Sequence, residues 1–166
     1  MKPLAFTLKA FPAITVVTIG LCYLTQHVAG WCGIELPDQA NLELVRKWAG
    51  WNMTFILLCA QVLLLMPAIE ESIFRWFLYR LPERLLGKRG AVAPAVEWTI
   101  IVIGSSLFSA AHYIAQPFPD SAFLALFFFG CAQCWLYTKT GRLWCAMLNH
   151  GLFNLANLIL LFLIPQ

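Results

Sequence analysis

The sequence predicts an all-α fold: a polytopic membrane helix bundle of about five transmembrane helices, within a range of four to six. Of the 166 residues, 61% are apolar and 11% are charged, and the mean hydropathy is +0.75. A soluble domain usually carries about 25% charged residues, so this chain has too little polar surface to coat a water-soluble globule. No repeat or linker interrupts residues 1–166, and we therefore expect a single integral membrane domain.

Five apolar runs are long enough, or nearly so, for a bilayer crossing, which needs roughly 20 residues. They cover residues 11–28, 51–80, 96–111, 121–137 and 143–164. Lys2 and Lys9 precede the first run and favour a cytoplasmic N-terminus. A cleaved signal peptide is the rival interpretation, but the run is long for one. Pro67 predicts a kink in the second run, where neighbouring helices can satisfy the freed carbonyl group.

The basic residues are concentrated in loops. The segment YRLPERLLGKRG separates the second and third runs, and the short turn TKTGR separates the fourth and fifth. Alternating helix directions place both loops on the cytoplasmic side, as the positive-inside rule requires. Nucleic-acid binding needs a basic stripe with stacking aromatic residues, so this arrangement argues against a nucleic-acid partner.

The six cysteines lie mostly inside apolar runs, where a thiol behaves as a small hydrophobic group. Cys131 and Cys134 form a CxxC pattern within the helical stretch FFFGCAQCWLY. A zinc or redox site usually needs a second pair. Ordinary helix packing is therefore the favoured interpretation.

Polar and titratable residues inside the apolar runs are the candidates for function. A charged group in hydrocarbon costs from about 2.5 to over 10 kcal/mol and usually faces a cavity or a partner. Such groups occur on three of the predicted helices, and they are Glu70, Glu71, Arg75, His112, Asn149, His150 and Asn154.

The spacing of these residues separates their roles. Glu71 and Arg75 are four residues apart, in the favourable order for an ion pair on one helix face. Glu70 is rotated from Glu71 by about 100°, so one carboxylate is neutralised while the other stays free for chemistry. His150 and Asn154 share a face and can donate hydrogen bonds to a developing oxyanion.

His112 follows Phe108 by one helical turn and can share a water with Glu70 if the two helices are neighbours. Its predicted depth is a difficulty. At a rise of 1.5 Å per residue, Glu70 lies about 15 Å from Arg80 and His150 about 12 Å from Arg142. His112 lies about 22 Å from Glu97 by the same measure, and so at a different depth. A tilted third helix, or one that starts later, would remove the discrepancy.

Non-catalytic interpretations exist for each group. Paired carboxylates with an arginine can be an ion-pair network retained for helix register. A histidine at a helix end can be an interfacial residue, and polar side chains commonly hold membrane helices together. Reactive groups on three different helices favour a shared site instead.

The segments EESIFR (70–75), FSAAH (108–112) and HGLFN (150–154) resemble the EExxxR, FxxxH and HxxxN motifs of the CPBP family of CAAX-processing and bacteriocin-processing (Abi-type) membrane proteases. The resemblance runs from about Leu63 to Leu160, with the motifs in the family's order. It implies a metal-independent glutamic intramembrane protease (a hydrolase and peptidase) without a cofactor. The implied roles are Glu70 as general base, His112 as a water-holding group, His150 and Asn154 as oxyanion donors, and Glu71 with Arg75 as a brace.

The resemblance also implies a protein or peptide substrate in the lipid bilayer. A prenylated C-terminus, a leader peptide and a C-terminal sorting signal are the alternatives, with the last two favoured, and a bacterial cytoplasmic membrane is the expected location. The chain departs from the family at Trp76, where a glycine often follows the motif arginine, and it is shorter than many relatives. Two other functions stay open: a zinc protease with Glu70, His112 and His150 as ligands, and a non-catalytic scaffold or bacteriocin-immunity factor.

Overall fold

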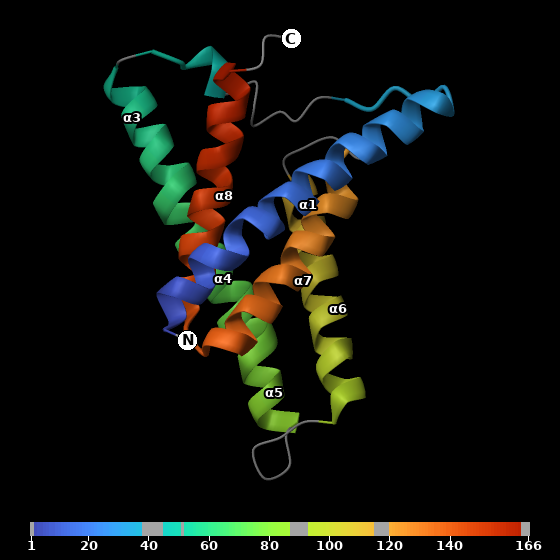
Figure 1. The fold of residues 1–166 in the computed structure, drawn as a ribbon, viewed down its shortest axis with the longest axis vertical. Helices are drawn as coiled ribbons and strands as arrows, with labels where there is room; N and C mark the ends of the chain where they lie inside the picture. The colour runs from blue at the N-terminus through green and yellow to red at the C-terminus, as the bar shows by residue number, and fades with distance from the viewer. Residues whose placement is uncertain (1, 38–44, 51, 87–92, 115–119, 164–166) are drawn as a thin grey trace.

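The computed structural model describes residues 2–37, 45–50, 52–86, 93–114 and 120–163. Five helical stretches in these residues are long and apolar enough to cross a membrane: Pro3–Trp31, Met53–Leu86, Pro94–Ile114, Ala122–Thr140 and Leu143–Leu163. No strand occurs in the ranges described. The predicted all-α bundle with five membrane-spanning helices is confirmed (Figure 1).

The second span is the least regular. It consists of α3 (Met53–Ala60), the π-helix η1 (Gln61–Leu65), α4 (Met66–Glu71), the π-helix η2 (Ser72–Arg80) and α5 (Leu81–Leu86). The other spans are α1 (Pro3–Trp31), α6 (Pro94–Ala111) with the 3-10 turn η3 (His112–Ile114), α7 (Ala122–Thr140) and α8 (Leu143–Leu163). π-helical turns inside longer helices are rare and are frequently found at functional sites.

One expected loop is partly helical. The basic segment that follows the second apolar run continues as α5, because Arg80 pairs with Glu83 one turn further along and such pairs favour helix. The Tyr79 hydroxyl group donates to Glu97 at 3.1 Å and ties this end of the span to α6. Lys88 and Arg89, which also belong to the predicted loop, lie outside the described residues.

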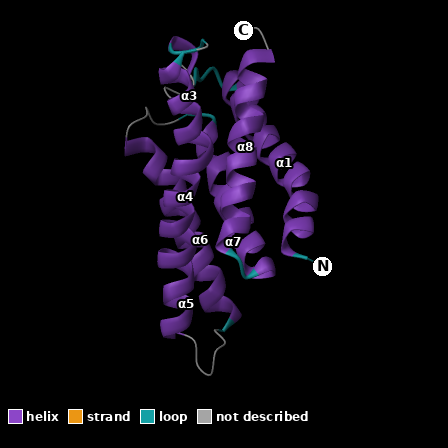
Figure 2. Ribbon diagram, turned by 90° about the vertical axis from the view of Figure 1, so that its left-hand side faces the viewer, coloured by secondary structure: helices purple, strands orange, loops and turns teal. Residues whose placement is uncertain are grey.

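The spans form three layers. Helices α7 and α8 lie in the middle, α1 covers one side of them, and the second span and α6 lie on the other side (Figure 2). α1 packs on α7 and α8, α6 packs on α7, and α4 and η1 pack on α8. This arrangement places the carboxylate-bearing span directly against the helix that carries His150.

An aromatic core joins the layers. Its buried members come from all five spans, and they are Ile14, Phe74, Phe108, Phe129 and Phe153. Phe108 and Phe129 are fully buried. Helices α6 and α7 approach closely where Gly130 faces Ser105, since a Cβ added to the glycine would lie 3.0 Å from the serine Cβ. Small residues at such crossings let membrane helices pack tightly.

The turn between α7 and α8 fixes the course of the last helix. Gly141 adopts a left-handed conformation with φ of 62°, and its N–H group donates to the Tyr137 carbonyl at 2.7 Å. This is a glycine cap at a helix C-terminus. Helix α8 therefore returns alongside α7 and carries His150 into the middle of the bundle.

Candidate active site

A buried ion pair lies at the centre of the polar residues. Glu71 ends α4 and Arg75 lies one turn further, in η2, and both side chains are fully buried. The Nε atom of Arg75 donates to Oε2 of Glu71 at 2.9 Å. The expected pairing of these residues is therefore present, and each charge removes much of the desolvation cost of the other.

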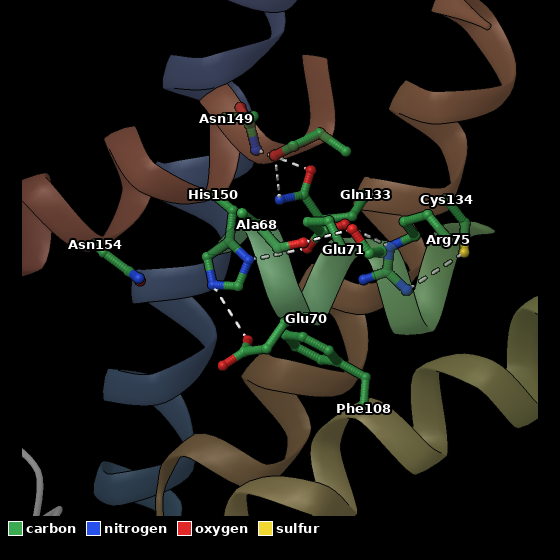
Figure 3. A network of polar contacts seen from close by, with 12 residues as sticks. Ala68, Glu70, Glu71, Arg75, Phe108, Gln133, Cys134, Asn149, His150 and Asn154 are labelled. Carbon is green, nitrogen blue, oxygen red and sulfur yellow. Dashed lines mark hydrogen bonds and ion pairs between the residues drawn. The ribbon is translucent and has the colours of Figure 1, made fainter. Parts of the chain in front are cut away.

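His150 reaches from α8 between the two carboxylates (Figure 3). Its Nδ1 atom lies 2.9 Å from Oε1 of Glu71, and its Nε2 atom lies 3.7 Å from Oε2 of Glu70. A carboxylate paired with arginine can only accept hydrogen bonds, so His150 donates its Nδ1–H to Glu71. The other ring nitrogen is thereby directed at Glu70.

Glu70 is the carboxylate left available. Arg75 is bonded to Glu71 and not to Glu70, as the rotation of the two positions predicted. The side chain of Glu70 is 20% exposed, and its Oε2 atom is buried with no hydrogen-bond partner among the described residues. A buried polar atom without a partner is costly, and at a functional site it marks a position for a ligand or water.

The FSAAH motif reaches this cluster through Phe108. The Nδ1 atom of His112 lies 2.8 Å from the Phe108 carbonyl oxygen, and the two rings are 4.8 Å apart. The Phe108 ring also lies 6.0 Å from the His150 ring and 5.2 Å from Cζ of Arg75. Within the described chain no hydrogen bond or ion pair joins His112 to Glu70.

The depth of His112 is not explained by a later start of its helix. α6 begins at Pro94, ahead of the predicted start at Val96, and ends at Ala111. His112 opens the 3-10 turn that follows. Of the FSAAH motif, Phe108 contacts the His150 ring, and His112 lies at the edge of the polar cluster.

Asn154 is bonded to the backbone of the second span. Its Nδ2 atom donates to the backbone carbonyl of Val62 in η1 at 2.8 Å. His150 is instead held by Glu71. The two side chains therefore share a helix face, as predicted, but they are anchored to different parts of the second span.

Three further buried residues support the cluster. Asn149 is one of the polar residues predicted from the fifth run, without a predicted role, whereas Gln133 and Cys134 were not predicted to support the site. Arg75 Nη1 donates to the Cys134 sulfur at 3.7 Å, and Asn149 donates to the Gln133 side-chain carbonyl at 3.3 Å. Gln133 in turn donates to the Ala146 carbonyl at 3.3 Å. The signal for Gln133 was present, because a carboxamide inside an apolar run usually bonds across helices.

The described residues contain no group of three or more histidine, cysteine, aspartate and glutamate side chains placed to hold a metal ion. What the site does contain is two adjacent carboxylates, one arginine and one imidazole. Such a set can move a proton between Glu70, His150 and a bound molecule.

We predict that Arg75→Met destabilises the fold strongly, because it leaves the Glu71 carboxylate buried without its cation. The free energy of unfolding should fall by about 3–5 kcal/mol, measured by denaturant unfolding in detergent micelles. Arg80→Met is the matched control, since the Arg80–Glu83 pair is partly exposed and should change the value by no more than about 1 kcal/mol. Equal losses of unfolding free energy for the two substitutions would show that the buried pair contributes no more to stability than an exposed one.

Comparison with known proteins identifies the family of the chain. No curated protein and no solved structure matches the chain. Residues 50–156, well over half of the chain, match the family model described as "Type II CAAX prenyl endopeptidase Rce1-like". The match contains all three motifs and confirms the resemblance to CAAX-processing proteases. The chain belongs to the Rce1-like family of type II CAAX prenyl endopeptidases, and it is an integral membrane protein and a CAAX-type intramembrane endopeptidase.

Proposed function

We propose that the protein hydrolyses a peptide bond with a water molecule activated by Glu70, in a glutamate-dependent mechanism without a metal ion. The observation that carries this proposal is the state of the two carboxylates. Glu71 is fully engaged by Arg75 and His150, whereas Glu70 is partly exposed and its buried Oε2 atom accepts no hydrogen bond from the residues that the structure describes. A general base needs a carboxylate free to take a proton, and Glu70 meets that condition.

The reaction follows from this assignment. Glu70 takes a proton from water as the water oxygen attacks the carbonyl carbon of the scissile bond. The tetrahedral intermediate then collapses, the C–N bond breaks, and the proton on Glu70 passes to the leaving amine. His112 can help to hold the water with Nε2, since its Nδ1 atom is engaged by the Phe108 carbonyl.

His150 and Asn154 are the proposed oxyanion donors. With one ring N–H committed to Glu71, His150 can donate from Nε2 only when that nitrogen also carries a proton, so the ring would act as an imidazolium. Asn154 has a second N–H on Nδ2 beside the one bonded to Val62. Donors held in place before the reaction stabilise an oxyanion without reorganisation in the transition state.

The substrate is proposed to be a membrane-associated protein or peptide. The family name points first to a prenylated C-terminus of the CAAX type, and a leader peptide or a C-terminal sorting signal are the alternatives. Mass spectrometry of membrane-protein termini in cells with and without the active protein would separate them. A terminus that disappears with the activity identifies both substrate and bond.

Glu70→Gln should abolish proteolysis and leave the fold intact, because it removes the base and keeps the shape. We expect a loss of at least about 10²-fold in the rate of cleavage of a farnesylated CAAX peptide. If that peptide is not cleaved by the unsubstituted protein, the Glu70-dependent terminus in cells is the readout. Glu35→Gln, on an exposed residue outside the spans, is the matched control and should have no effect. Full cleavage activity of Glu70→Gln would show that Glu70 is not the general base.

Chelators provide the test against a zinc mechanism. If Glu70 activates water directly, dialysis against 1,10-phenanthroline should leave the cleavage rate unchanged. Loss of activity that zinc restores would instead make Glu70, His112 and His150 candidate ligands.

A cytoplasmic N-terminus is part of the proposal, on the grounds of Lys2, Lys9 and the basic turns. α1 would then carry the exposed Cys32 to the outer side of the membrane. A membrane-impermeant maleimide applied to intact cells should label the protein through Cys32, and Cys32→Ser should remove the labelling. Labelling of Cys32 only after cell lysis would mean the opposite orientation.

A further inference from the structure

The second span changes its hydrogen-bond register at Pro67. In η1 the Met66 N–H group donates five residues back, to the Gln61 carbonyl. In the same register the next donor would be residue 67, and its acceptor would be the Val62 carbonyl. Proline has no backbone N–H, so the helix itself offers Val62 no donor at this point.

Helix α8 supplies the donor that the proline lacks. Nδ2 of Asn154 lies 2.8 Å from the Val62 carbonyl oxygen. The backbones are also close here, because a Cβ added to Gly151 would lie 2.5 Å from the Leu63 carbonyl oxygen. Only a glycine allows this approach without a shift of one backbone.

The same contact lies next to the candidate active site. Gly151 directly follows His150, and Pro67 precedes Glu70 and Glu71 by one turn. A shift of α8 along the second span would therefore move the His150 ring relative to both carboxylates. The hydrogen bond to Val62 also fixes the plane of the Asn154 carboxamide, and with it the direction of its second N–H.

We propose that Pro67 is a positioning residue: its missing N–H keeps the Val62 carbonyl open for Asn154, and this bond sets the register between α8 and the carboxylate-bearing span. The structural part of this inference is independent of the enzymatic mechanism. Its effect on turnover rests on the proposed function, in which Asn154 and His150 stabilise the oxyanion.

A double-mutant cycle tests the structural part. Asn154→Ala should lower the midpoint of thermal unfolding by about 5 °C in the unsubstituted protein, because the Val62 carbonyl loses its donor. In a Pro67→Ala background the new backbone N–H can take that carbonyl, so Asn154→Ala should cost less than half as much. Contacting residues that share a partner are expected to couple in this way.

Pro12 provides the matched control. It is a second proline inside a membrane helix, and its side chain is exposed on α1. Pro12→Ala and Asn154→Ala should be additive, as distant substitutions are. Additivity in the Pro67 cycle as well would overturn the proposal.

A measurement on the unsubstituted protein covers the case in which Pro67→Ala does not fold. The Asn154 side-chain amide, identified by its absence in Asn154→Asp, should exchange with deuterium at least tenfold more slowly than that of Asn52 in ¹⁵N NMR spectra. Asn52 uses its side-chain oxygen to cap α3, and it is exposed. Equal exchange rates would contradict the proposed bond.

Turnover is the last readout. Pro67→Ala should lower kcat by about 10-fold to 100-fold, since small misplacements of catalytic groups have effects of that size. KM for the farnesylated peptide should stay within about twofold, because the peptide-binding surface is unchanged. A rise in KM at constant kcat would assign Pro67 to substrate binding. If neither the unsubstituted protein nor any variant is active while the stability cycle shows coupling, the proposed function fails and the positioning role of Pro67 stands.

Discussion

The arrangement of the site depends on one buried ion pair. Glu71 and Arg75 neutralise each other inside a helix bundle where an isolated charge would be very costly. Because Glu71 is held as a carboxylate by the arginine, it accepts the Nδ1–H of His150 and fixes how the ring is turned. The second ring nitrogen then faces Glu70, which pairs with no lysine or arginine among the described residues. Two adjacent glutamates thus receive different roles from their surroundings.

Backbone irregularity is the second feature that the site needs. A regular α-helix would satisfy its own carbonyls and leave a neighbouring helix little to bind. The π-helical turn before Pro67 instead presents the Val62 carbonyl to Asn154, and the absence of a side chain at Gly151 lets the two backbones meet. Polar contacts of this kind can hold membrane helices in one register. Packing of apolar side chains alone specifies such a register less sharply.

Much of this could be predicted from the sequence. Hydropathy predicts the five spans, because an apolar run in lipid must satisfy its own backbone hydrogen bonds and therefore forms a helix. The four-residue spacing of Glu71 and Arg75 predicts their ion pair. The partners of Asn154 could not be predicted, because the π-helical register of η1 depends on how α8 packs. The basic residues of α5 predict a loop, whereas the structure is helical there, because the same residues can form ion pairs along a helix.

The protonation of the His150 ring tests the central claim most directly. ¹⁵N NMR of the imidazole, with the signal assigned by its loss in His150→Gln, reports which nitrogen carries hydrogen. We predict a proton on Nδ1, whether or not Nε2 is also protonated, and loss of this preference in Glu71→Ala. A neutral ring protonated on Nε2 alone would contradict the account, since Glu71 could not then hold the histidine toward Glu70.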